Sequence, residues 1–296
     1  MSMDKPEILV SKKYHKKNLF VESWLRLRTN PGAVFGLGVI VLMLLLLIYS
    51  LIFISFDQIM AINPANRLQP PSASHPFGTD QMGRDVLTRV VFGTRYSLTV
   101  GFGAVAIGFI FGVFLGAIGG FYGGWRDETI LRVSDIITAV PALLLGMVIV
   151  QVLGASLFTL LLAVGISNIP GFARMTRAAV LAVKDAEYVE ASRAIGMSEF
   201  RIIFTQVLPN SLSPLIVIAT SRLATSILMA ASLSFLGFGI PPPLPEWGAL
   251  VSAGRNYMRI APHITLYPGL VIMLVTFALA ILGDGLRDAL DPRLKK

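Results

Sequence analysis

The sequence predicts an all-α membrane protein that crosses the bilayer with six transmembrane helices. Apolar residues make up 54% of the 296 residues and charged residues only 14%. The mean hydropathy of +0.72 lies far above the range of soluble proteins. Charged residues cluster between long uncharged runs and at the chain ends, which is typical of a polytopic membrane protein. This clustering argues against nucleic-acid binding despite a net charge of +8.

Residues 1–32 form a basic segment ahead of the first uncharged run, residues 33–56. At about 1.5 Å per residue, this run is long enough to span a hydrocarbon core of roughly 30 Å. It is too long for a signal-peptide core and no small-residue cleavage site follows, so we interpret it as a retained anchor. The basic residues in front of it predict a cytoplasmic N-terminus; they are Lys12, Lys13, Lys16, Lys17, Arg26 and Arg28.

Residues 57–96 form a polar segment that we expect outside the cytoplasm. Residues 84–92 within it predict a short amphipathic helix, with Val86, Leu87, Val90 and Val91 on one side. The sequence is compatible with a plain interfacial anchor and equally with a functional role for this helix.

The next run, residues 97–124, predicts a span with a stripe of small residues. Gly108, Gly112, Gly116 and Gly120 follow one another every fourth residue. Such a stripe lets another helix backbone approach closely, so we expect tight packing within the bundle. No strand precedes these glycines, which argues against a cofactor-binding loop.

Three further runs supply the four other spans of the expected five-helix core, residues 97–284. The uncharged run 136–173 is too long for one span, and residues 154–156 predict a break that makes it a hairpin. Pro141 is expected to kink the first arm. The last spans are residues 210–238 and 264–282, joined by a proline-rich connection whose Trp247 is expected at the lipid headgroups.

This topology places the tail, residues 285–296, in the cytoplasm together with the N-terminus. The charge distribution agrees with it. Of the 25 Lys and Arg residues, 18 fall in expected cytoplasmic segments, six in expected outer segments, and Arg222 within a span.

A polar island within the loop 175–209 predicts two short cytoplasmic helices that meet at Gly196. Asp185 and Ser198 are candidate N-caps, and Pro209 is expected to stop the second helix. Small residues on the first helix would let it lie in a groove of a partner protein, with charged residues fixing the register. An ordinary solvated loop is the alternative.

Arg222 lies near the middle of a predicted span. A charge at that depth costs about 2.5–3.5 kcal/mol on insertion scales, so it should face protein or water. Ser221 and Thr225 are expected to share a polar face with it. Two interpretations stay open: these residues line a substrate path, or the arginine is satisfied structurally.

The chain offers no energy source and no catalytic group. It contains no phosphate-cradling G-x-x-x-x-G-K-[ST] loop and no Asp or Glu inside a predicted span. The histidines His15, His75 and His263 lack metal-ligand spacing, and no nucleophile or metalloprotease motif occurs. We therefore expect no catalytic site, no metal site and no cofactor in this chain, and a conduit driven from outside.

Two segments resemble permeases of ABC importers. The first resembles their cytoplasmic coupling loop, E-A-A-x-x-x-G with a later I-x-L-P, here Glu190, Ala191, Ser192, Gly196, Gln206, Leu208 and Pro209. Serine and glutamine replace one alanine and the isoleucine. Residues 78–98 carry every fixed position of G-T-D-x-x-G-R-D-x-x-[ST]-R-x-x-x-G-x-R-x-S-L, which is similar to the dipeptide, oligopeptide and nickel branch.

The resemblance implies a type I importer permease fold in a bacterial or archaeal cytoplasmic membrane. It implies a homologous second permease, two cytoplasmic ATPase subunits that bind ATP and Mg²⁺, and an extracytoplasmic solute-binding protein. Peptides are the expected cargo; nickel or other metal chelates, or a non-transporting scaffold role, are the alternatives. The residues implied in ATPase coupling are Glu187, Tyr188, Glu190, Ala191, Ser192, Arg193 and Gly196.

Overall fold

The computed structural model describes residues 19–290, and within that range it consists of helices and loops without a strand. Lys12, Lys13, Lys16, Lys17 and residues 291–296, which carry part of the predicted cytoplasmic charge, lie outside the described residues. The helices are α1 (Leu19–Thr29), α2 (Pro31–Phe53), α3 (Phe56–Met60), α4 (Val86–Tyr122), α5 (Gly124–Ala139), α6 (Ala142–Leu153), α7 (Leu157–Leu181), α8 (Glu187–Ala194), α9 (Glu199–Ile202), α10 (Leu208–Asn210), α11 (Leu212–Phe235), α12 (Trp247–Gly254) and α13 (His263–Leu290).

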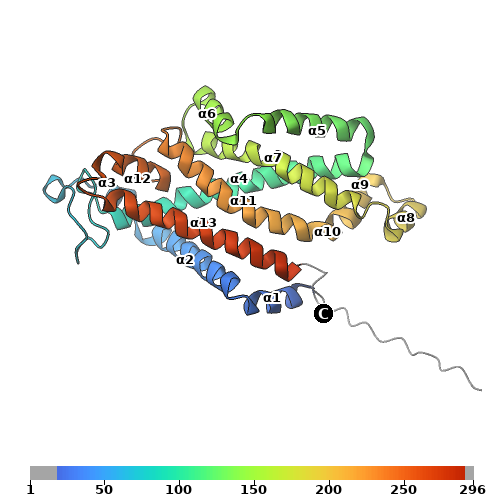
Figure 1. Cartoon of the computed structure of the whole chain (residues 1–296), viewed down its shortest axis with the longest axis horizontal. Helices are drawn as coiled ribbons and strands as arrows, with labels where there is room; N and C mark the ends of the chain where they lie inside the picture. The colour runs from blue at the N-terminus through green and yellow to red at the C-terminus, as the bar shows by residue number, and fades with distance from the viewer. Residues whose placement is uncertain (1–18, 291–296) are drawn as a thin grey trace, which may run out of the picture.

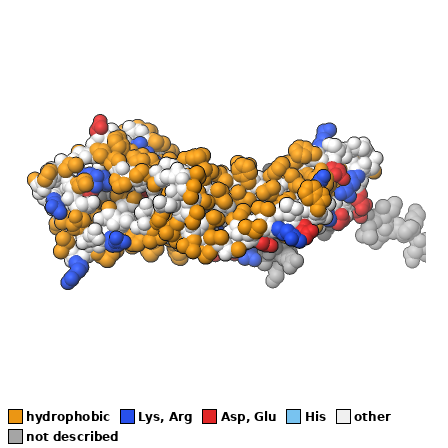
Figure 2. Space-filling model, turned by 90° about the horizontal axis from the view of Figure 1, so that it is seen from above, with side chains coloured by type: hydrophobic (Ala, Val, Ile, Leu, Met, Phe, Trp, Pro, Cys, Tyr) orange, Lys and Arg blue, Asp and Glu red, His pale blue; other side chains and the backbone are white. Residues whose placement is uncertain are grey.

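The fold is an elongated bundle of long helices (Figure 1). Five described helices, α2, α4, α7, α11 and α13, are long and apolar enough to cross a membrane. The pair α5 and α6 passes the same test together but is bent by 87°. The prediction of an all-α membrane protein is therefore confirmed, with the bent pair standing where a sixth straight span was expected. Figure 2 shows charged side chains gathered toward the two ends of one face and a largely apolar middle.

Helix α2 packs on the outside of this bundle, against α13 and α4. Asn30 caps it by accepting a hydrogen bond from the backbone N–H of Ala33, and Pro31 occupies the first turn, where its missing N–H costs nothing. In its most apolar stretch only 22% of residues are buried, against 50% in α7. Most of the α2 surface is therefore left for lipid or for a partner chain.

The glycine stripe of α4 lies against α7, and these two helices form the most extensive helix contact in the described chain. A methyl group built on Gly112 would lie 2.5 Å from Cβ of Phe172 and 2.7 Å from the carbonyl oxygen of Ile169. On Gly116 it would lie 2.3 Å from the carbonyl oxygen of Ala173. At these two glycines the backbones of α4 and α7 are thus closer than any side chain there would allow.

The prediction of a short interfacial helix at residues 84–92 is wrong. Helix α4 runs unbroken through 37 residues from Val86, or about 55 Å. Its first turns hold the buried Arg89 and the partly buried Arg95, and protein groups accept hydrogen bonds from both. Arg89 donates to the Ile59 carbonyl at 3.2 Å, and Arg95 donates to Ser50 Oγ at 2.7 Å and to the Ile54 carbonyl at 2.8 Å. Because protein groups accept hydrogen bonds from these arginines, this stretch packs inside the bundle as the first part of α4 rather than as a separate helix at the membrane surface.

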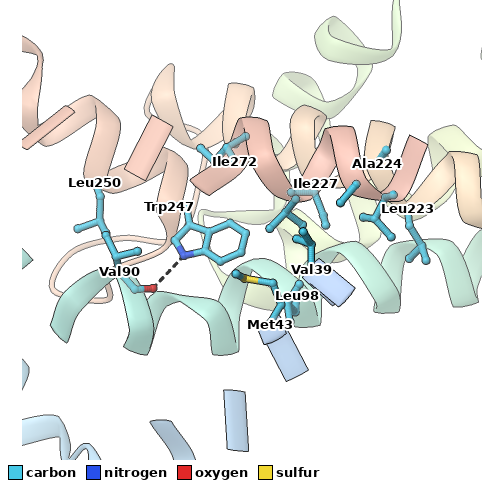
Figure 3. Close-up of a cluster of buried hydrophobic side chains, with 14 of the residues drawn as sticks. Val39, Met43, Val90, Leu98, Leu223, Ala224, Ile227, Trp247, Leu250 and Ile272 are labelled. Carbon is cyan, nitrogen blue, oxygen red and sulfur yellow. Dashed lines mark hydrogen bonds between the residues drawn. The ribbon is translucent and has the colours of Figure 1, made fainter. Parts of the chain in front are cut away.

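The prediction that Trp247 lies at the lipid headgroups is also wrong. The side chain is fully buried rather than at the headgroups, and its indole Nε1–H donates to the Val90 carbonyl at 3.0 Å (Figure 3). Gly93 makes room for this loop, because a methyl group there would lie 2.1 Å from the Pro245 carbonyl oxygen. The surrounding side chains come from α2, α4, α11 and α13: Val39, Met43, Leu98, Ile227 and Ile272.

The hairpin expected within residues 136–173 is present in altered form. The break at residues 154–156 exists, with Ser156 capping α7. However, α5 precedes the first arm and includes the charged stretch 125–135, and the chain turns sharply between Ala139 and Ala142. Pro141 removes a backbone donor at this point, so a bend replaces the expected kink. Arg177 joins α7 to α5 through two bonds of 2.6 Å to the Asp127 carboxylate.

We expect Gly112→Ala to lower the free energy of unfolding by about 1–3 kcal/mol, because the added methyl group overpacks the α4–α7 contact. Gly38→Ala on α2 is the matched control, since no atom lies within 4 Å of its built methyl position. The measurement is the thermal unfolding midpoint of each variant purified in detergent. Equal midpoints for the two variants would contradict the close approach.

Candidate functional site

The polar island forms α8 and a sharp turn that returns the chain to the bundle. Ala186, not Asp185, is the N-cap residue, and no side chain caps it. Gly196 ends the helix at φ +79°, and the Met197 N–H then donates to the Ser192 carbonyl at 3.1 Å. An L side chain would be strained at that φ, which is why glycine stands there.

Helix α8 turns one edge inward and the other outward. Val189 is fully buried in a cluster with Phe121 and Ile202, and Ser192 donates to the Tyr188 carbonyl at 2.8 Å. Ser192 therefore lies on the inner edge, away from the surface expected to meet a partner. The other candidates are exposed and form, with Ile195, what we term the coupling surface: Glu187, Tyr188, Glu190, Ala191, Arg193, Ile195 and Gly196.

The chain leaves this surface as an almost continuous helix into the bundle. Ser198 stands at the N-cap of α9 but makes no capping hydrogen bond. Pro209 does not stop the helix, because a π-helical stretch, Ile203–Val207, precedes it. The wider π-helical turn leaves room for the proline ring and tolerates the missing backbone N–H of Pro209. The break comes at Ser211, and α11 follows directly. The coupling surface is thus joined to α7 on one side and α11 on the other.

Arg222 on α11 lines a cavity of about 320 Å³ between α6, α7 and α11. Thr225 lines the same cavity, whereas Ser221 lines a different one of about 600 Å³ near the end of α13, with Asp284 and Arg287. The expected polar face of three residues is therefore divided between two sides of α11.

Two residues at Arg222 were not singled out from the sequence. Asn168 of α7 is buried, and its Nδ2 donates to Ser226 Oγ at 2.9 Å. Gly171 of α7 lies under the guanidinium, since a methyl group there would be 2.3 Å from Nη2 of Arg222. The sequence could have indicated Asn168, because a polar amide within an apolar span is unusual. It could not have indicated Gly171, because the role of this glycine depends on which helix faces it.

The segment 78–98 builds a buried charge cluster at the start of α4. Asp80 accepts hydrogen bonds from the Arg84 side chain at 2.7 Å and from the backbone N–H of Met82 and Arg84 at 2.8 and 3.0 Å. Arg89 lies 3.8 Å from the same carboxylate. Gly83 allows the chain to pass Asn63, whose carbonyl oxygen would be 1.8 Å from an added methyl group.

Asp85 completes the start of α4. Its carboxylate accepts from the Thr88 backbone N–H at 2.7 Å and lies 2.9 Å from Nδ1 of His75. His263 Nε2 lies 3.0 Å from the Thr79 carbonyl oxygen, which ties the cluster to α13. The matched motif is thus a structural clasp that holds the ends of α2, α4 and α13 together.

Glu246 is a fully buried carboxyl outside the spanning helices. Its Oε2 accepts the Ala249 backbone N–H at 3.0 Å and caps α12, and Ser97 donates to its Oε1 at 3.1 Å. Burial raises the pKa of the Glu246 carboxyl, and these hydrogen bonds oppose that rise. This residue holds α12 on α4 and lines neither of the two cavities beside α11.

These features together define a membrane subunit of a transport system: a helical bundle, an exposed two-helix loop between two spanning helices, and a cavity within the spans that is lined by apolar side chains and a few polar groups. The sequence matches two families, described as binding-protein-dependent transport system inner membrane component, over residues 99–296, and N-terminal TM domain of oligopeptide transport permease C, over residues 18–71. The chain belongs to the family of binding-protein-dependent transport system inner membrane components. It is a multi-pass permease subunit of an ABC importer and is itself non-catalytic.

Curated relatives cover nearly the whole chain. The dipeptide transport system permease protein DppC of Alkalihalophilus pseudofirmus is 47% identical over 274 residues, which are 93% of this chain and 90% of the relative. The glutathione transport system permease protein GsiD of Pectobacterium atrosepticum is 40% identical over 275 residues, 93% and 91% of the two chains.

Solved structures share the fold at lower identity. The MetNI methionine ABC transporter in an inward-facing form matches with a TM-score of 0.55 and 21% identity, covering 69% of this chain and 96% of that one. An amino acid ABC transporter crystallised with histidines matches with a TM-score of 0.54 and 16% identity, covering 68% and 94%. The type I importer permease fold predicted from the sequence is confirmed.

We expect Asp80→Asn to destabilise the protein by about 3–5 kcal/mol, because it leaves two buried guanidinium groups without a counter-charge. Glu128→Gln is the control: it breaks an exposed pair with Arg132, worth about 0–1 kcal/mol. Thermal unfolding midpoints in detergent report both effects. Similar small losses in the two variants would contradict a clasp built on Asp80.

Glu246 predicts a specific pH dependence. Its carboxyl ionises near the ordinary pKa of 4.5 in the unfolded chain and at higher pH in the folded protein. Ionisation therefore favours the unfolded state as the pH rises from about 4.5 through the folded pKa, and stability falls across that window. Glu246→Gln should remove this fall, whereas the exposed-site control Glu199→Gln should keep it. Parallel profiles of unfolding midpoint against pH for wild type and Glu246→Gln would contradict the assignment.

Proposed function

We propose that this chain is one of two homologous permease subunits of an importer for di- or oligopeptides or a related small solute. The observation that carries the cargo class is the similarity, over more than nine-tenths of this chain, to a dipeptide and a glutathione permease. Both are named for peptide-like solutes. The clasp motif, typical of the peptide and nickel branch, supports the same assignment, and nickel or other metal chelates are the second candidate.

The coupling surface is the proposed contact with a cytoplasmic ATPase subunit. Its outer edge combines charged residues, Glu187, Glu190 and Arg193, with the exposed apolar side chain of Ile195, which is 79% accessible. Charged groups fix register in an interface, while an exposed apolar group contributes burial on docking. Two ATPase subunits, which bind ATP and Mg²⁺, and an extracytoplasmic solute-binding protein complete the proposed assembly.

The proposed orientation follows from the ends of the bundle. Helix α1, the C-terminal end of α13 and the coupling surface lie toward one end of the molecule (Figure 1). With the ATPase in the cytoplasm, this end is cytoplasmic, both termini included, and the clasp lies on the outer side of the bacterial or archaeal cytoplasmic membrane. The positive-inside distribution supports this orientation.

The proposed mechanism is rigid-body coupling. Closure of the ATPase pair moves α8, and α8 is packed through Val189 onto side chains of α4, α7 and the segment before α11. Because well-packed elements transmit displacement as units, motion of α8 tilts the ends of α7 and α11, which flank the Arg222 cavity. A non-transporting scaffold would have the same fold but no such dependence of transport on α8.

We expect Glu190→Lys to uncouple ATP hydrolysis from uptake, because it reverses a charge on the coupling surface without touching the buried edge. Uptake by the complete transporter in proteoliposomes should fall about tenfold or more while the chain still inserts and assembles. Glu128→Lys, on an exposed part of α5, is the charge-matched control and should keep most uptake. Full uptake by Glu190→Lys would count against the coupling role.

The turn at Gly196 gives a second test. Gly196→Leu forces an L side chain into φ +79°, at a cost of about 1–2 kcal/mol, and should misplace α8. Gly196→Asn is the matched variant, because asparagine tolerates this region better, and space is open around the position. Uptake per ATP hydrolysed should fall in the leucine variant and recover in the asparagine variant. Equal uptake per ATP hydrolysed in the two variants would contradict a role for the turn.

A further inference from the structure

The Arg222 guanidinium is a charge within the bundle that the described chain leaves without a partner. It forms no hydrogen bond, ion pair or ring contact with residues in the described range. Every other guanidinium placed within the bundle above has an acceptor: Arg84 and Arg89 at the clasp, Arg95 at the end of α2 and Arg177 at Asp127. Arg222 therefore differs from the structural arginines of this fold.

The surroundings hold this charge in place without neutralising it. The guanidinium lies over the α7 backbone at Gly171, where a side chain would collide with it. The neighbouring charge is Arg174, which repels it and lies 3.6 Å from the carboxylate of Asp135. No Asp or Glu lines the cavity. The cavity is thus a positive site to which the described chain supplies no anion.

The lining of the cavity suits a small amphipathic solute. Its volume of about 320 Å³ falls at the lower end of the range for ligand pockets. Hydroxyl and amide groups lie beside apolar side chains, so that polar and apolar parts of one molecule can both be met. The lining residues that matter here are Ser167, Asn168, Arg222, Thr225, Ser226 and Met229.

We propose that Arg222 receives a carboxylate of the transported solute within the membrane and that Thr225 and Asn168 lie beside this carboxylate site. A fork of guanidinium N–H donors matches a carboxylate in geometry and charge. Within the spans the interaction is weakly screened, so a carboxylate is favoured over a neutral group of the same shape. The proposal deepens the proposed function, on which it rests for the identity of the solute.

A thiol-labelling experiment tests the site without requiring transport. The chain contains no cysteine, so Thr225→Cys introduces its single thiol. In the complete transporter, we expect this thiol to react about tenfold faster with an anionic methanethiosulfonate than with a cationic one of similar size. Adding Arg222→Gln should bring the two rates to within about twofold. Ser232→Cys, in the same cavity, is the second reporter if Thr225→Cys does not assemble.

A protection experiment identifies the chemistry that is bound. Di-alanine should slow labelling of Thr225→Cys, and its C-terminal amide should not. Inorganic phosphate is the second probe, and it distinguishes a site for phosphate from a site for carboxylate. If phosphate protects Thr225→Cys and di-alanine does not, the site binds a free phosphate or a lipid phosphate, and the proposal is overturned. Loss of the di-alanine effect in Arg222→Gln, with retention in Arg222→Lys, is the expected pattern.

An uptake experiment then separates this proposal from the proposed function. Arg222→Gln should lower uptake of di-alanine about tenfold at unchanged assembly, and Arg132→Gln, an exposed arginine on α5, should not. If the wild-type complex transports no peptide, the proposed cargo is wrong while the labelling ratio still reports on the site. Equal labelling by both reagents, or a ratio unaffected by Arg222→Gln, would overturn the anion site. The same follows if neither cysteine variant reacts.

Discussion

The close contact of α4 with α7 is the constraint on which the rest of the structure depends. At Gly112 and Gly116 the two backbones approach so closely that one methyl group would collide with a carbonyl oxygen. In a bilayer no hydrophobic force brings helices together, so such close van der Waals packing is what fixes their register. Relative to α4, this contact sets the position of α7. The coupling surface at its end, and Asn168 and Gly171 on its side, take their places from it.

Charge is handled in three different ways along the same bundle. At the clasp, two arginines share the buried Asp80 carboxylate, and Asp85 both caps α4 and meets His75. At the end of α2, Arg95 donates to Ser50 Oγ and to the carbonyl of the C-cap residue Ile54, which the helix leaves open. At Arg222, the third case, the described chain supplies no acceptor. Burying an unpaired charge is costly, and this cost is the physical reason for proposing a ligand at Arg222.

The coupling surface and the Arg222 cavity are linked by rigid elements rather than by a loop. Val189 packs α8 against Phe121 and Ile202. The π-helical stretch continues α9 into α10, which ends just before α11. Two of the helices that line the cavity, α7 and α11, are thus joined to α8, α7 by a short turn and α11 through α9 and α10. In the proposed mechanism, a displacement of α8 reaches the cavity through these packed side chains.

The sequence by itself determined the class of protein, the order of the spans and the turn at Gly196, because hydropathy, charge clustering and a residue that tolerates positive φ are local properties. It also supplied the glycine stripe, although not the helix that the stripe meets. Only the tertiary structure decided that α4 begins at Val86, that Trp247 is buried and that Ser221 faces away from Arg222. These outcomes depend on partners distant in sequence, such as Ile59 for Arg89, Gly93 for the Trp247 loop and Gly171 for Arg222. A single residue pattern cannot specify them, because the same polar or aromatic side chain suits lipid headgroups or a buried acceptor equally well until the facing helix is in place.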